Sequence, residues 1–129
     1  MMRLKNDLYT VSRRDTQGMT GSFEIKLNPS CFIYKAHFPG EPVTPGVCIV
    51  QMALELMEEL TGVKMEITRV KNVKFLSVIS PRQTTTLTYD IKKVEMSEMT
   101  GEMSAQITVM SGEDTKAKLS FSCRKAHNT

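Results

Sequence analysis

The spacing of hydrophobic positions changes twice along this chain and separates three stretches of different character. Residues 23–27 alternate apolar and charged side chains, which is typical of a half-buried strand. A second strand is predicted over residues 8–13, with a turn at Asp15–Gly18 between the two. Cys31–Phe38 is rich in β-forming residues and predicts a further extended piece.

The middle stretch has the spacing of a helix. Apolar residues fill most positions from Val47 to Leu60, with polar groups only at Gln51, Glu55, Glu58 and Glu59. Thr44 is the expected N-cap, Pro45 suits the first helical position, and Gly62 is expected to close the helix. Because the first two turns are apolar almost all round, other structure must surround this helix.

After Gly62 the two-residue alternation returns in four consecutive runs. They contain Val73 and Phe75; Leu87, Tyr89 and Ile91; Met103, Ala105, Ile107 and Val109; and Ala117, Leu119, Phe121 and Cys123. Ser111–Asp114 is expected to join the last two as a hairpin. The fold class predicted is therefore α+β: a mostly antiparallel sheet of about six strands around one long central helix.

Composition narrows the class of protein. The 129 residues fit a single domain spanning 1–129, and 40% apolar with 24% charged residues is ordinary for a globular chain. A net charge of +3, no tryptophan and no basic block argue against a nucleic-acid partner. The longest near-apolar run, Val43–Leu56, is too short to span a membrane. MMRLKNDLYT lacks an apolar signal segment, so we expect a cytoplasmic protein.

The cysteine and histidine pattern predicts no metal site. Cys31, Cys48 and Cys123 are odd in number, far apart and without CxxC spacing, so we interpret them as buried thiols in a reducing compartment. His127 lies in a polar tail and is expected to be exposed.

The segment AHFPGEPVTPGVCIVQMALE, residues 36–55, contains most of the candidate chemistry. Three prolines spaced three apart stiffen the loop between His37 and the helix start at Gly46–Val47. The first amides of a helix have no internal partner and lie in positive potential, and Gly46 adds no side chain there. An imidazole beside free amides suits a carbonyl that must carry negative charge. A plainer interpretation stays open, because a histidine near prolines is usually structural and Gln51 and Glu55 form an ordinary i, i+4 helix pair.

HFPGEPVTPGV, residues 37–47, resembles the signature of the FabZ-like 3-hydroxyacyl-[acyl-carrier-protein] dehydratases, which have a hotdog fold. That pattern reads roughly H-F-P-G-x-P-x-x-P-G-V, and every fixed position is present. VKNVKFLSVISPRQTTTLTYDI, residues 70–91, looks like the strand pair that follows the central helix in the family. The likeness covers about residues 7–124 and is strongest at 37–55.

The resemblance implies a homodimer or a higher assembly of dimers, with the site between protomers. The substrate would be an acyl chain on the phosphopantetheine of an acyl carrier protein, or a CoA thioester, and no other cofactor is expected. His37 would transfer protons near neutral pH, and the Gly46 and Val47 amides would bind the thioester oxygen. Val47, Ile49 and Val50 are candidates for the walls of the acyl tunnel.

One position departs from the family pattern. Fourteen residues after His37 stands Gln51, where the family has an acid, and an amide cannot protonate a leaving hydroxyl. Glu55 shares its helix face about 6 Å further from the helix start, and the two residue types look exchanged. Three hypotheses follow. Glu55 reaches the site through water or Gln51; or His37 acts as both base and acid while Gln51 holds the hydroxyl; or the reaction has changed to thioester hydrolysis, or to acyl-carrier binding without catalysis.

Overall fold

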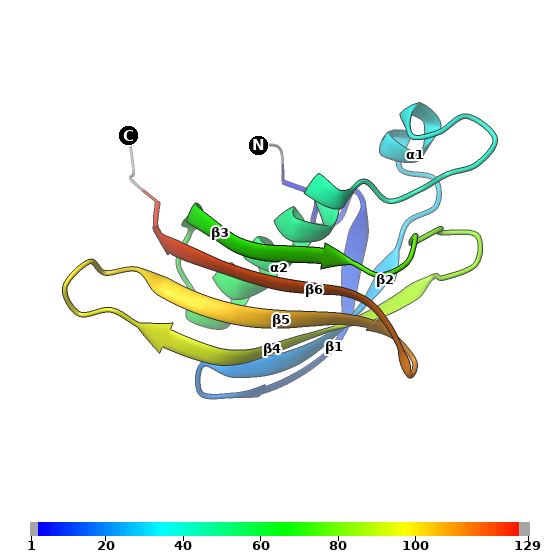
Figure 1. Ribbon diagram of the computed structural model, residues 1–129. Coiled ribbons are helices and arrows are strands. Elements are labelled where there is room, and N and C mark those ends of the chain that lie inside the picture. Colours follow the sequence, from blue (N-terminus) through cyan, green and yellow to red (C-terminus); the bar gives the residue numbers. More distant parts are fainter. Residues whose placement is uncertain (1–2, 127–129) are drawn as a thin grey trace.

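The computed structural model describes residues 3–126, which form one curved sheet and two helices (Figure 1). The strands are β1 (Tyr9–Gln17), β2 (Thr20–Leu27), β3 (Met65–Phe75), β4 (Thr86–Met96), β5 (Met103–Ser111) and β6 (Asp114–Lys125). The helices are α1 (Phe32–Ala36) and α2 (Gly46–Thr61). Within the described residues this confirms the predicted α+β class, a six-stranded sheet around one long helix.

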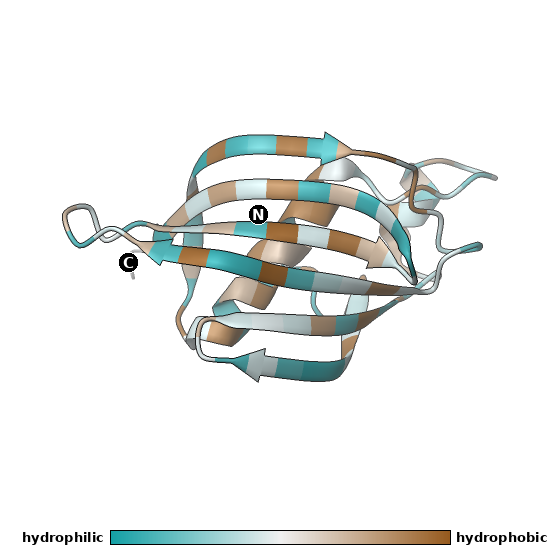
Figure 2. Ribbon diagram, turned by 60° about the horizontal axis from the view of Figure 1, so that its bottom comes forward, coloured by the Kyte–Doolittle hydropathy of each residue, from teal (hydrophilic) through white to brown (hydrophobic). Residues whose placement is uncertain are grey.

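The sheet has the strand order β1-β2-β4-β5-β6-β3, and every neighbouring pair is antiparallel. Alternation places one side chain in two toward the helix, as in the cross-strand pairs Phe23–Tyr89 and Ile107–Leu119. Figure 2 shows the helix lying behind the sheet, with hydrophobic and hydrophilic residues alternating along the strands. The predicted hairpin is confirmed, since Ser111 pairs with Asp114.

Helix α2 packs its apolar surface against the concave side of the sheet. Met52, Ala53, Leu56 and Met57 are almost completely buried there. Burying an aliphatic side chain of this size contributes ~1.5–3 kcal/mol, so the helix and sheet stabilise one another through this face. The Tyr89 hydroxyl donates to the Ile49 carbonyl at 2.9 Å and fixes the helix to β4 at one point. Gly62 closes the helix with a left-handed φ of 78°, as predicted.

Three local predictions were wrong. Cys31–Phe38 was expected to be extended, but most of it forms the short helix α1, because Cys31 and Tyr34 are buried and the Cys31 carbonyl accepts the Tyr34 amide. Strand β1 continues through the expected turn to Gln17, so the turn falls at Gly18 and Met19. Thr44 is not the N-cap; Pro45 takes that position and α2 begins at Gly46.

None of the helices within residues 3–126 is long and apolar enough to cross a membrane. All three cysteines are free and buried, as expected. His127 lies outside the described residues.

Candidate active site

The loop after α1 holds the backbone of His37 firmly and leaves its side chain exposed. The His37 amide donates to the Ile33 carbonyl at 3.0 Å, and the His37 carbonyl accepts the Val43 amide at 2.8 Å. Phe38 and Glu41 exchange backbone hydrogen bonds of 3.1 and 3.0 Å and close the tip of the loop. The imidazole therefore projects from a fixed backbone toward solvent, where a substrate or a second protein can reach it.

Arg82 fastens the same loop from the segment between β3 and β4. Its Nη1 donates to the Gly40 carbonyl at 2.9 Å. Arg82 and Lys35 also line a hollow of about 360 Å³ together with Phe38. Two basic side chains thus lie beside the His37 loop.

The start of α2 has the free amides that the sequence predicts. Cys48 and Ile49 donate to the Pro45 carbonyl at 3.0 and 3.1 Å, whereas the Gly46 and Val47 amides have no hydrogen-bond partner within residues 3–126. The Thr44 hydroxyl does not cap them and is bonded to the Tyr34 hydroxyl at 2.9 Å. Two N–H groups and the positive end of the helix dipole are therefore available to bind a polarised oxygen.

Tyr34 supports this arrangement from α1. Burial raises the pKa of the Tyr34 hydroxyl to about 12, against a smaller lowering by its bond to Thr44. The phenol therefore stays neutral, and the bond to Thr44 joins α1 to the residue that precedes the helix start. The sequence analysis missed Tyr34, since nothing in the local pattern pairs it with Thr44.

A groove of about 400 Å³ runs beside the helix start between α2 and the segment after β3. Its walls are mainly apolar and include Gly46, Ile49, Phe75, Val78 and Ile79. His37 does not line this groove in its own protomer. Val43, whose amide donates to the His37 carbonyl, does line it, so the His37 loop borders the groove without its imidazole being part of the lining.

Phe75 explains why residue 46 is glycine. A Cβ at Gly46 would lie 2.7 and 2.8 Å from two atoms of the Phe75 ring, closer than carbon atoms approach. The expected open space at Gly46 is therefore occupied by this ring, which is itself 49% exposed. The sequence analysis assigned no such role to Phe75.

The three candidate tunnel residues differ in position. Ile49 is buried and reaches the groove, and Val50 is half-buried against the core. Val47 is 61% exposed and does not line the groove. Other large apolar side chains of the protomer that are exposed include Phe38, Phe75, Leu76 and Val78.

Gln51 and Glu55 are in direct contact. The Gln51 side-chain nitrogen donates to Glu55 Oε2 at 2.9 Å. Glu55 is 3% exposed and also accepts the Leu4 amide, the Lys5 amide and the Tyr9 hydroxyl, at 2.8, 2.8 and 3.0 Å. Each carboxylate oxygen receives two donors, which fills its lone pairs. The hypothesis in which Glu55 acts through Gln51 has the contact it requires, whereas no lone pair of this carboxylate remains free for a water.

The end of α2 carries further acidic contacts to the N-terminal segment. Glu58 accepts Arg3 and the Met65 amide, each at 2.9 Å. Glu59 accepts Lys5 and Arg14 at 3.0 and 2.8 Å, and the hydrogen bond from Arg14 is the main cause that lowers the pKa of Glu59. This part of the helix therefore holds the N-terminal segment and β1 in place.

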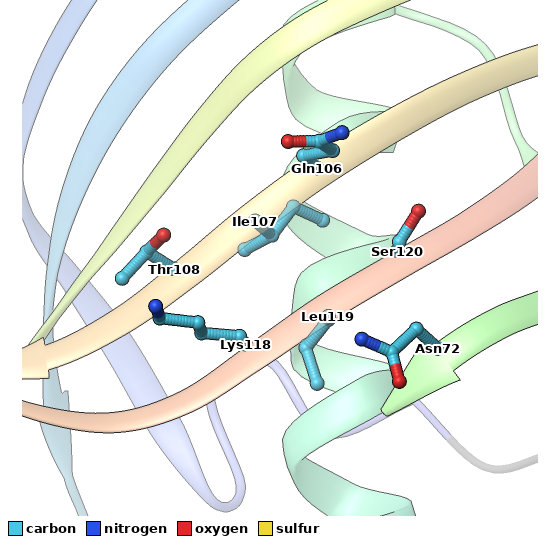
Figure 3. Close-up of a pocket in the computed structure, with 7 residues that line it drawn as sticks. All are labelled: Asn72, Gln106, Ile107, Thr108, Lys118, Leu119 and Ser120. Carbon is cyan, nitrogen blue, oxygen red and sulfur yellow. The ribbon is translucent and has the colours of Figure 1, made fainter. Parts of the chain in front are cut away.

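The acidic, histidine and cysteine side chains of residues 3–126 form no metal centre. Within the described part of the chain no group of three or more His, Cys, Asp or Glu side chains is placed to hold a metal ion. A shallow polar hollow lies on the outer face of the sheet, lined by Gln106, Thr108, Lys118 and Ser120 (Figure 3). It faces away from the helix and from the His37 loop.

Comparison with known proteins decides the family. The model of the ApeI-like family, described as ApeI dehydratase, matches residues 12–113. The chain belongs to this family.

Two curated relatives are 3-hydroxyacyl-[acyl-carrier-protein] dehydratases FabZ. That of Oenococcus oeni is 33% identical over 68% of this chain and 67% of its own length. That of Fusobacterium nucleatum is 30% identical over 61% of this chain and 57% of its own length. The chain thus matches little more than half of the Fusobacterium protein.

Solved structures confirm the hotdog fold. The dehydratase heterocomplex ApeI:P from Xenorhabdus doucetiae superposes with a TM-score of 0.68 at 17% identity, covering 89% of this chain and 96% of that chain. The dehydratase domain from the CurJ module of curacin polyketide synthase gives a TM-score of 0.54 at 11% identity, covering 92% of this chain and 42% of that one. At these identities the likeness establishes the fold alone, while membership of the ApeI-like family follows from the sequence match.

Proposed function

We propose that this ApeI-like protein dehydrates 3-hydroxyacyl thioesters on acyl carrier protein to trans-2-enoyl thioesters, in fatty acid or related polyene or polyketide synthesis. The observation that carries the proposal is that residues 3–126 contain both an exposed His37 on a fixed loop and two amides at the start of α2 that have no partner there. The family match and the FabZ relatives point to the same reaction. The substrate's phosphopantetheine arm is the only prosthetic group that the reaction requires.

The mechanism follows from the residues present. His37 removes the C2 proton as the electron pair moves toward the thioester carbonyl. The Gly46 and Val47 amides bind the carbonyl oxygen as it gains negative charge, and one such donor can contribute ~3–4 kcal/mol. The electron pair then returns from the carbonyl to form the C2–C3 double bond, and the C3–O bond breaks. His37 returns the proton to the departing hydroxyl, which leaves as water, while Gln51 holds that hydroxyl.

Two protomers complete the site in this proposal. His37 does not line the groove at Gly46 in its own chain, and exposed Val47, Phe75 and Val78 supply apolar surface for a second copy. A homodimer would bring the imidazole of one protomer to the helix start of its partner. A higher assembly of dimers is compatible with the same contact. The free, buried cysteines support a cytoplasmic location.

A second candidate is a subunit that binds acyl carriers and pairs with an active relative. Two observations favour it: Gln51 stands where the family has an acid, and the similar ApeI:P protein is a heterocomplex of dehydratases. Thioester hydrolysis is the remaining alternative and has no such support.

One experiment separates these functions. The full chain is mixed with a trans-2-enoyl thioester, and loss of the enoyl absorbance and release of free thiol are followed together. A dehydratase hydrates the enoyl group reversibly without releasing thiol, and His37→Ala abolishes the reaction. Thiol release would indicate a thioesterase. Binding of an acyl carrier protein without either reaction would indicate the non-catalytic subunit.

A further inference from the structure

The contact between Gln51 and Glu55 determines which hydrogen-bonding group residue 51 presents. An ionised carboxylate only accepts hydrogen bonds, so the partner that faces Glu55 must be the Gln51 nitrogen. The Gln51 oxygen then points away from Glu55. That oxygen has no hydrogen-bond partner within residues 3–126, and it is not among the side-chain atoms that are both buried and unpartnered. It therefore reaches the surface of the protomer.

Glu55 cannot easily turn to release this arrangement. Its two oxygens are held by the Leu4 and Lys5 amides, and Tyr9 adds a third bond from β1. These donors come from residues 46 to 51 positions away in the sequence, so the carboxylate is anchored by tertiary structure rather than by its own helix. The direction of the Gln51 amide is fixed as a consequence.

Gln51 also lies on the part of the helix that leads to the free amides. Val47, Gln51 and Glu55 follow at four-residue intervals and share one face. Exposure falls along this row, from 61% at Val47 through half-buried Gln51 to 3% at Glu55. The Gln51 oxygen is thus one turn from the amides that would bind a thioester oxygen.

We infer that Glu55 is a positioning residue, which orients Gln51 so that this site offers an acceptor to the substrate's 3-hydroxyl. This inference rests on the proposed function and deepens it. The site would select 3-hydroxyacyl thioesters, whose hydroxyl donates to Gln51. It would disfavour 3-oxoacyl thioesters, whose carbonyl oxygen would face the Gln51 oxygen.

Glu55→Met makes the inference testable. The Leu4 and Lys5 amides bind different oxygens of Glu55, so a glutamine at position 55 could keep its oxygen toward Leu4 and Gln51 and leave Gln51 as it is. Methionine keeps the length of the side chain but offers Gln51 no carboxylate, so the Gln51 amide could turn either its oxygen or its nitrogen to the substrate. Adding Gln51→Glu restores an outward acceptor, because both oxygens of a carboxylate accept hydrogen bonds.

The measurement compares the affinities of 3-hydroxybutanoyl, 3-oxobutanoyl and butanoyl pantetheine for the full chain. All variants carry His37→Ala so that no thioester is consumed. With Gln51 and Glu55 intact, we expect the 3-hydroxy compound to bind roughly tenfold tighter than the 3-oxo compound. Glu55→Met should abolish this preference, and Gln51→Glu combined with Glu55→Met should restore it. Tyr9→Phe is the matched control: it removes one bond to Glu55, leaves the Gln51 contact, and should keep the preference.

The outcomes are distinct. A folded Glu55→Met variant with an unchanged preference overturns the inference, as does an equal loss of affinity for all three compounds, which a purely structural role would produce. If Glu55→Met does not fold, Gln51→Leu replaces it: loss of the preference supports the inference and its retention overturns it. If no thioester binds to the full chain, both the inference and the proposed function fail. If enoyl hydration by the chain with His37 is normal while the preference is absent, only the inference fails.

Discussion

The two ends of helix α2 are built in opposite ways. At its start the Gly46 and Val47 amides have no partner within the described residues, and the half-exposed Phe75 ring lies against Gly46. Toward its end Glu55 receives four hydrogen bonds, and Glu58 and Glu59 hold basic residues of the N-terminal segment and β1. The comparison teaches that the acidic end serves stability, while the unsatisfied end is left free to bind. Gln51 lies between them: its contact with Glu55 in the acidic part orients it, and its free oxygen lies toward the start of the helix.

The largest effect should come from the chemistry beside the free end. His37→Ala should lower the rate of enoyl hydration by about 10²–10⁴-fold, because a positioned proton carrier is lost. The thermal midpoint should change little, since the side chain is exposed. Stopped-flow absorbance and calorimetry check both. A marked fall in the thermal midpoint together with the fall in rate would mean that His37 is structural.

The opposite end should respond in stability. Glu55→Ala leaves the buried Leu4 amide and the Tyr9 hydroxyl without their acceptor, and each unpaired group costs ~1–3 kcal/mol. We expect a loss of about 2–4 kcal/mol in the free energy of unfolding by urea. Glu66→Ala is the control, because its exposed pair with Arg124 contributes about 0–1 kcal/mol. Equal losses in the two variants would contradict this account of Glu55.

Gly46→Ala tests the free end without removing a polar group. The new methyl group must displace the Phe75 ring, which is exposed enough to move, so stability should fall by less than about 1 kcal/mol. The displaced ring would enter the groove and lower activity roughly 10–100-fold. Phe75→Leu should recover much of this loss in the double variant. If Phe75→Leu gives no recovery, the collision does not cause the defect.

The smallest expected effect is in the acid range. Arg14 and Lys5 hold the pKa of Glu59 below its ordinary value of 4.5. The stabilisation from Glu59 is therefore complete above that value and is lost as pH falls below 4.5 through the pKa of the folded state. Glu59→Gln should flatten this part of the stability curve and leave it unchanged near neutral pH. Urea midpoints measured between pH 3 and 7 would show it, and an unaltered slope below pH 4.5 would contradict it.

Local pattern predicted much of this molecule, and the failures have one physical cause. The strands around Phe23, Tyr89 and Ile107 follow from alternation, and the helix and its end at Gly62 follow from spacing and glycine. The loop of His37 and the helix start follow from a motif of eleven residues. The contacts of Glu55 do not, because its partners Leu4, Lys5 and Tyr9 are remote in sequence.

The same cause explains the errors near the site. Cys31–Phe38 contains β-forming residues, but burial of Tyr34 and its bond to Thr44 override that propensity. That bond also removes Thr44 from the capping position. The contact between Gly46 and Phe75 joins residues on α2 and β3, and no sequence pattern predicts it.

The buried thiols have a practical consequence for following this protein in solution. Burial raises the pKa of Cys48, and it raises that of Cys123 to about 11, so little reactive thiolate exists near neutral pH. Alkylating dyes should therefore leave the folded chain almost unlabelled. In Val47→Cys the new thiol would be the reactive position. The fluorescence of a dye attached there would report when a second molecule covers the start of α2.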